Sequence, residues 1–164
     1  MITFEARKIH KLMTMTQGEP VLLTLHPVLS RCFLKFDISN AGEPDYDLPN
    51  EESSSPAVYP PVSSLTLENR EGYTHLITID ASGRSPSTGV TVQDVLRTIH
   101  EDLRKPLRSN EWTTGKLSNE ARAAVDGAFR ERCRERDELA QGLRRIDYLC
   151  GRDRLQILPE MLVL

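Results

Sequence analysis

The sequence has few cysteines, few aromatic residues and little net charge. Its three cysteines, Cys32, Cys133 and Cys150, are an odd number and lie among apolar residues, which argues against a disulfide framework and predicts reduced core thiols. Aromatic residues make up 5% of the chain, and the formal net charge is -3. Proteins that bind nucleic acid or anionic membranes usually show a clear basic excess. We therefore expect an intracellular, cytoplasmic protein that binds neither nucleic acid nor membrane.

Long apolar runs are also absent. No stretch approaches the roughly 18 to 20 apolar residues of a membrane-spanning helix, and the N-terminus lacks the pattern of a cleavable signal. Residues 1–20 mix apolar with basic side chains, so we expect a flexible or weakly helical tail there. The chain of 164 residues has the size of one domain. We assign that domain to residues 21–164.

Residues 40–60 form an acidic segment that is rich in proline and serine. It contains five acidic residues and no lysine or arginine, a composition that cannot fill a core and predicts a long inserted loop. Just before it, residues 32–38 alternate apolar and polar side chains, as a half-buried strand does.

Two hairpins are predicted further along the chain. Residues 65–68 and 77–81 alternate in polarity on either side of a short segment that contains Gly72, which is typical of a β-hairpin. Residues 143–150 and 155–158 show a similar arrangement around Gly151, and we expect a final hairpin there.

Two helices are predicted between these hairpins. From Val92 to Leu103 the apolar residues recur at steps of three and four, Thr91 is a suitable N-cap, and Pro106 follows the end. A second helix is expected from Ser118 onward. Strands, two helices and further strands indicate an α+β fold, namely a mostly antiparallel sheet with two helices packed on one face.

Several short segments occur in a fixed order between Leu25 and Pro159. They are His26-Pro27-Val28-Leu29, Leu34-Lys35-Phe36-Asp37 and residues 60–65, 90–96, 103–106, 130–133 and 142–152. In their order and spacing they resemble a fungal family of uncharacterised proteins, common in mushroom-forming species, with a single domain of unknown function. The chain departs from this family at His26, where Asn is usual, and at Phe36, where Trp is usual. The resemblance implies a shared intracellular domain, and it supplies no known activity and no catalytic residues.

Residues that could carry chemistry show no convergent pattern. The four histidines lack the spacing of a metal site. Cys133 and Cys150 lie on apolar faces, where core packing is the commoner role, and His100 is expected to be a partly exposed surface residue. The sequence therefore identifies no catalytic residue, no metal ligand and no cofactor, and it favours a protein that is not an enzyme.

Arginine is concentrated near the C-terminus, where nine arginines and seven acidic residues lie between residues 122 and 154. The local excess of two positive charges is typical of a solvated surface. The sharper hypothesis is a clamp in which Arg145, Arg152 and Arg154 hold a phosphate or carboxylate, with Asp147 orienting one of them.

Two further features suggest contacts with a partner. Trp112 is the only tryptophan and is either an exposed binding residue or a lid over the core. Residues 157–164 are unusually apolar for a chain end. They either form an edge strand of their own sheet or form a homodimer through the C-terminal strand.

These patterns favour a non-enzymatic intracellular module that binds an unknown protein partner or an anionic ligand. The alternative is a small enzyme that acts on an anionic small molecule held by the arginine hairpin.

Overall fold

A computed structural model describes residues 2–9, 23–30, 34–35, 48–69, 75–82, 89–107, 118–134, 139–150 and 154–158. The strands are β1 (Ile2–Ile9), β2 (Thr24–Leu25), β3 (Leu34–Lys35), β4 (Val58–Tyr59), β5 (Ser64–Asn69), β6 (His75–Asp80) and β7 (Arg154–Leu158). The α-helices are α1 (Pro27–Ser30), α2 (Asn50–Ser53), α3 (Val92–Leu103) and α5 (Asn119–Cys133), and the 3-10 helices are η1 (Leu139–Gln141) and η2 (Arg145–Leu149).

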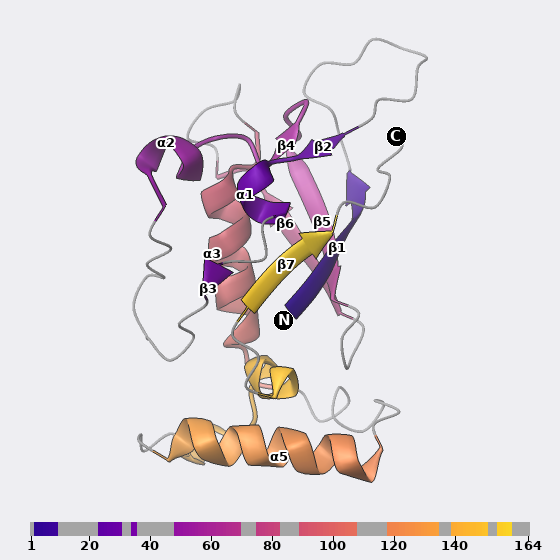
Figure 1. Ribbon diagram of the computed structural model, residues 1–164, viewed down its shortest axis with the longest axis vertical. Coiled ribbons are helices and arrows are strands. Elements are labelled where there is room, and N and C mark those ends of the chain that lie inside the picture. The colour runs from indigo at the N-terminus through magenta and orange to yellow at the C-terminus, as the bar shows by residue number, and fades with distance from the viewer. Residues whose placement is uncertain are drawn as a thin grey trace.

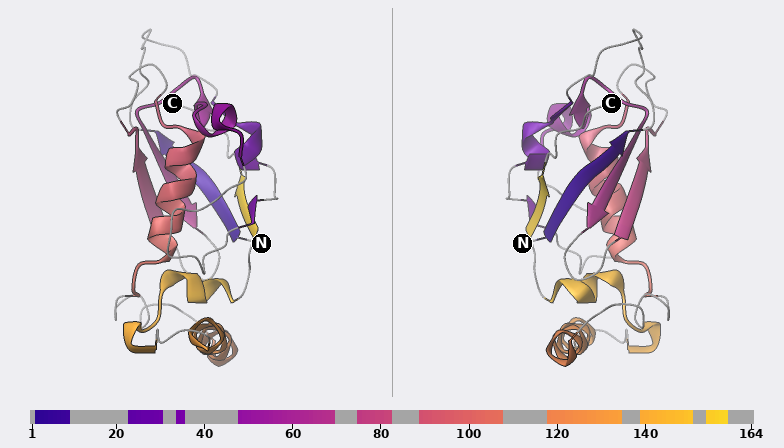
Figure 2. Two further views of the ribbon diagram at one scale, coloured as in Figure 1. Left: turned by 90° about the vertical axis from the view of Figure 1, so that its left-hand side faces the viewer. Right: turned by 90° about the vertical axis from the view of Figure 1, so that its right-hand side faces the viewer.

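A five-stranded sheet in the order β3-β7-β1-β5-β6 forms the centre of the fold (Figure 1). Strand β7 runs parallel to β1, and the other neighbouring pairs are antiparallel. Helix α3 lies along one face of the sheet, as the side views show (Figure 2). Strands β2 and β4 form a separate two-stranded sheet. The predicted α+β class with a mostly antiparallel sheet is therefore confirmed.

Strand β1 lies in the middle of the sheet, whereas the sequence analysis expected a flexible or weakly helical tail over residues 1–20. Its ladder with β5 contains a β-bulge between Ala6 and Lys8. A bulge adds one residue to a strand and shifts the alternation of its side chains. Ile2, Phe4 and Ala6 alternate with polar residues before the bulge, whereas Ile9 falls out of this period-two pattern, so only part of the strand is recognisable in the sequence.

The apolar core lies between the sheet and α3. Leu65 and Leu67 of β5 are register partners of Ile79 and Ile77 of β6, and all four side chains are buried. The predicted hairpin is thus confirmed. Helix α3 contributes its own buried apolar residues, Val92, Val95, Leu96, Ile99 and Leu103. Burial of one such side chain stabilises the fold by roughly 1.5–3 kcal/mol, so this layer holds β5, β6 and α3 together.

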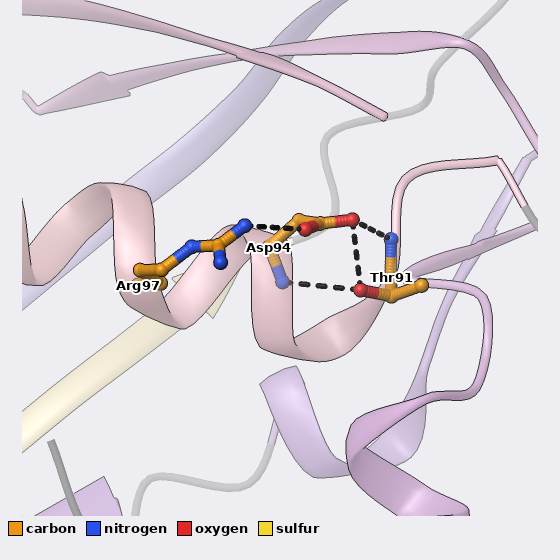
Figure 3. A network of polar contacts seen from close by, with 3 residues as sticks. All are labelled: Thr91, Asp94 and Arg97. Carbon is orange, nitrogen blue, oxygen red and sulfur yellow. Dashed lines mark hydrogen bonds and ion pairs between the residues drawn. The ribbon is translucent and has the colours of Figure 1, made fainter. Parts of the chain in front are cut away.

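Helix α3 begins at the predicted N-cap, where Thr91 and Asp94 form a capping box (Figure 3). The Thr91 hydroxyl accepts a bond from the Asp94 N–H at 3.1 Å, and the Asp94 carboxylate accepts one from the Thr91 N–H at 3.1 Å. Arg97 donates to the other carboxylate oxygen of Asp94 at 2.9 Å. These bonds satisfy a carboxylate that is buried, and a cap of this kind contributes about 1 kcal/mol to helix stability.

Part of the predicted acidic loop forms secondary structure, because α2 and β4 lie within residues 40–60. Ala57 and Val58 are fully buried. The Ala57 carbonyl accepts a bond from the His26 N–H at 2.8 Å, and its N–H donates to the Val90 carbonyl at 2.8 Å. The loop prediction is wrong for these residues, because their backbone groups are satisfied by distant segments that local composition does not reveal.

The predicted C-terminal hairpin does not form. Residues Arg145–Leu149 are the 3-10 helix η2, and β7 pairs with β1 and β3. The Asp147 carboxylate accepts a bond from the Arg144 N–H at 2.8 Å and so caps the first turn of η2. Cys150 follows η2 with a φ of 49°, in the left-handed region. Neither a strand nor a right-handed helix continues through such a conformation.

Helix α5 begins where it was predicted, and Ser118 is its N-cap, whose hydroxyl accepts a bond from the Ala121 N–H at 3.2 Å. Its buried side chains are Val125 and Cys133. Of the two helices expected on one face, α3 lies there, whereas α5 packs against η2, crosswise beyond the end of the sheet (Figure 1). The reason is that η2 lies between α5 and the sheet.

Candidate functional site

Three of the five residues that were predicted to bind a ligand or partner lie in the described part of the chain. Arg145 and Asp147 belong to η2, and Arg154 is the first residue of β7, opposite Lys35 of β3 in the register. Trp112 and Arg152 lie outside the described residues. Among the described side chains, the predicted clamp is therefore represented by Arg145 and Asp147.

The Asp147 side chain forms a buried, two-pronged ion pair with Arg132 of α5. The Arg132 Nε lies 2.7 Å from Oδ1, and its Nη2 lies 2.9 Å from Oδ2. The Asp147 side chain is 1% exposed and that of Arg132 is 14% exposed. Bidentate, charge-assisted bonds of this kind are the strongest that side chains make. Asp147 therefore joins η2 to α5.

Arg132 makes two further contacts that hold its guanidinium in place. Its Nη2 donates to the Gly142 carbonyl at 3.1 Å, and its guanidinium carbon lies 5.4 Å from the centre of the Phe129 ring. The second distance is within the range of a cation–π interaction. The donors of Arg132 are thus directed at groups of the same chain.

Arg145, the other described residue of the predicted clamp, forms an ion pair with Asp102 of α3. Lys105 approaches the same carboxylate oxygen at 3.0 Å. The Arg145 N–H also donates to the Lys105 carbonyl at 3.1 Å. The Arg145 side chain is 10% exposed, so its charge is directed into the protein, and it joins η2 to the end of α3.

We call the residues of these ion pairs the ion-pair cluster: Arg132, Asp147, Arg145, Asp102 and Lys105. They connect α5, η2 and α3 in series. Sequence reasoning missed Arg132 and Asp102, because their partners lie 15 and 43 residues away.

A sequence signal for these two residues did exist. Arg132 follows Ala121, Val125 and Ala128 at helical spacing, and Asp102 follows Ile99 three residues later. A charged residue on an apolar helix face needs a buried partner.

The other titratable groups do not converge. In the described residues no group of three or more histidine, cysteine and acidic side chains could hold a metal ion. Cys133 is buried as predicted, but Cys150 is exposed because it lies in the turn after η2. His100 is buried rather than partly exposed. A hydrogen bond from Ser118 lowers the pKa of Glu120, which lies in the exposed first turn of α5.

Strand β6 presents a second kind of candidate site, because it is an edge strand of the sheet. Its side chains alternate cleanly. Ile77 and Ile79 are buried, whereas Leu76, Thr78 and Asp80 are exposed, Leu76 by 58%. One face of β6 therefore belongs to the core, and the other is accessible.

The hydrogen-bond pattern shows which backbone groups of β6 face outward. The Ala81 N–H donates to the Ser63 carbonyl at 2.9 Å, which makes these two residues a hydrogen-bonded pair of the antiparallel ladder. Bonded and non-bonded pairs alternate in such a ladder. Ile77 and Ile79 therefore bond to β5, and the N–H and C=O groups of Leu76, Thr78 and Asp80 point to the open edge.

The open edge has no strand beside it among the described residues. An edge of this kind offers a row of backbone donors and acceptors to another chain. The rest of the sheet holds this row in an extended conformation. The binding of a partner would therefore cost little conformational entropy in the protein itself.

Comparison with known proteins identifies a family whose function is unknown. Residues 30–161 match a family that is described as a family of unknown function, DUF6699. No curated protein and no solved structure matches the chain. Among the described residues no helix is both long enough and apolar enough to cross a membrane.

Proposed function

The chain belongs to the DUF6699 family of unknown function, and on that premise we propose that it is a non-enzymatic module which binds an extended segment of another protein along β6. The open edge of β6 carries this proposal. Leu76, Thr78 and Asp80 direct their backbone groups outward, and an added strand would satisfy them, as in other modules that bind peptides by β-augmentation.

The exposed side chains of β6 specify the chemistry of the partner. In an added strand, the residue beside Leu76 would lie against an apolar surface, and the residue beside Asp80 would lie near a carboxylate. Opposite charges and apolar pairs across neighbouring strands each contribute roughly 0.2–1 kcal/mol. The favoured segment therefore has an apolar and a basic residue four positions apart, with alternating polarity between them.

The ion-pair cluster supports a module more than it supports the alternative enzyme. Arg145 was expected to hold an anionic substrate and Asp147 to orient one of the clamp arginines, but each is engaged with a side chain of another helix. A charge that is paired in this way offers little to a ligand, because binding would leave its buried partner without a counterion. Anion binding by Arg152 and Arg154, and a role for Trp112, stay predictions.

Peptide selection tests the proposed function. A library of random peptides displayed on phage would be selected on the purified full chain, and the selected peptides would be measured against two variants by fluorescence anisotropy. Thr78→Pro removes one outward N–H without removing a bond to β5. Thr78→Val keeps that N–H and closely matches the size of threonine.

We expect the selected peptides to bind the wild type and Thr78→Val, and to lose roughly 2- to 13-fold in affinity for Thr78→Pro, which corresponds to the loss of one backbone hydrogen bond. Circular dichroism would confirm that both variants are folded. Peptides that bind Thr78→Pro as tightly as the wild type would show that β6 is not the binding edge.

We further propose that the module acts in the cytoplasm of a fungal cell. The free thiols of Cys133 and Cys150 are compatible with a reducing compartment, and the sequence resembles a fungal family. Microscopy of the chain fused to a fluorescent protein, in a fungal host, would test the compartment, and a signal confined to the secretory pathway would contradict it.

A further inference from the structure

We infer that β6 also pairs with β6 of a second copy of the chain, so that a homodimer closes the open edge when no partner is bound. The inference rests on the same edge as the proposed function. It places the contact at β6 rather than at the C-terminal strand, because β7 already lies between β1 and β3.

Strand β6 has few of the features that keep edge strands apart. Natural edge strands are usually protected by charged side chains, especially lysine, by proline, by a β-bulge or by short length. The six residues of β6 include no lysine or proline, their exposed charge is the Asp80 carboxylate, and their register with β5 is uninterrupted. The opposite edge strand, β3, has two residues, one of which is Lys35. The less protected edge is therefore β6.

The backbone of β6 can pair with that of a second copy. In an antiparallel pair centred on Thr78, this residue lies opposite Thr78 of the second copy, and threonine pairs are favourable across strands. The outward backbone groups of β6 then meet their counterparts. Ile77 lies opposite Ile79, and Leu76 lies opposite Asp80, a pair that opposes no like charges but gives Asp80 no basic partner. The isoleucines extend the apolar layer of each sheet into the other.

Sedimentation equilibrium of the full chain tests the dimer. We expect the wild type and Thr78→Val to show a reversible monomer–dimer equilibrium. Thr78→Pro removes a bond at the centre of the pair, and Thr78→Lys opposes two positive charges there, so both should be monomeric at the concentrations where the wild type is dimeric. A wild type that stays monomeric up to about 1 mM, the range of the weakest specific complexes, would overturn the inference.

Leu76→Lys tests the register. In the pair centred on Thr78, two new lysines would each face Asp80 of the other copy, and dimerisation should tighten by roughly 2- to 30-fold. Gln93→Lys, at an exposed position of α3, adds the same charge away from β6 and should leave dimerisation unchanged. Weaker dimerisation of Leu76→Lys would exclude this register.

The two proposals fail separately. Peptide binding that is sensitive to Thr78→Pro in a chain that is always monomeric would reject the dimer and keep the proposed function. If the chain forms a dimer that depends on Thr78 but no peptide can be selected on it, the proposed function is rejected and the dimer is kept.

Discussion

Removal of the Asp147 carboxylate is the perturbation that most directly tests how α5 is held to the rest of the fold. Asp147→Ala takes away both acceptors of the Arg132 guanidinium and the acceptor of the Arg144 N–H. The ion-pair cluster then loses its link between α5 and η2. The main contacts of α5 are with η2, so the loss should affect the whole helix.

The size of the effect follows from burial. Removing one partner of a buried ion pair costs roughly 3–5 kcal/mol, because the other charge is left without a counterion. Arg132 is 14% exposed, so water can partly replace the lost carboxylate, and we expect the lower end, about 3 kcal/mol. Asp147→Asn keeps an acceptor for the Arg144 N–H and should cost less than Asp147→Ala.

Urea unfolding followed by circular dichroism measures this cost, and a double-mutant cycle assigns it. Arg132→Ala, Asp147→Ala and the double variant should show a coupling energy of roughly 1–3 kcal/mol. The control is Arg134→Ala, because Arg134 lies 3.5 Å from Glu131 in a pair whose side chains are 75% and 76% exposed. Such a pair contributes at most about 1 kcal/mol.

A cost below about 1 kcal/mol for Asp147→Ala, equal to that of the exposed control, would refute the reasoning. Additive effects of Arg132→Ala and Asp147→Ala would refute the pairing specifically. In either case Asp147 would be available to orient an arginine of the predicted clamp.

Two glycine substitutions should change stability in opposite directions. Gly89→Ala should destabilise the protein by about 3 kcal/mol or more. Gly89 has a φ of 63°, and an added Cβ would lie 3.0 Å from the Val62 nitrogen and closer still to the Val62 carbonyl oxygen. An unchanged urea midpoint would contradict this close approach. Gly127→Ala should stabilise the protein by roughly 0.5–1 kcal/mol, because Gly127 is an exposed residue of α5 with nothing within 4 Å of an added Cβ. A lower thermal midpoint would show that α5 is covered at this position.

The best-predicted elements are those whose signals are local. Helix α3 was identified with its N-cap because Thr91 directly precedes a run of regularly spaced apolar residues. The β5–β6 hairpin was identified for a similar reason, since both strands alternate without a bulge. Here the residues that decide the structure are neighbours in the sequence.

The elements that were missed depend on distant partners. Strand β1 was missed because the alternation of Ile2, Phe4 and Ala6 is short and ends at the bulge, and because its place beside β7 joins opposite ends of the chain. The polarity pattern of residues 143–150 predicts a strand in place of η2, because neither the capping role of Asp147 nor its ion pair with Arg132 is visible in such a pattern.

The residues of the candidate site also differ in whether the sequence or only the structure reveals their role. Sequence alone identified Arg145 and Asp147 as unusual charged residues, because arginine is concentrated near them. Only the tertiary structure decided that they pair with Asp102 and Arg132, and that β6 rather than the C-terminal strand is a long edge of the sheet. The physical reason is that charge and polarity belong to each residue, whereas burial, ion pairing and the position of a strand in a sheet depend on segments that only folding brings together.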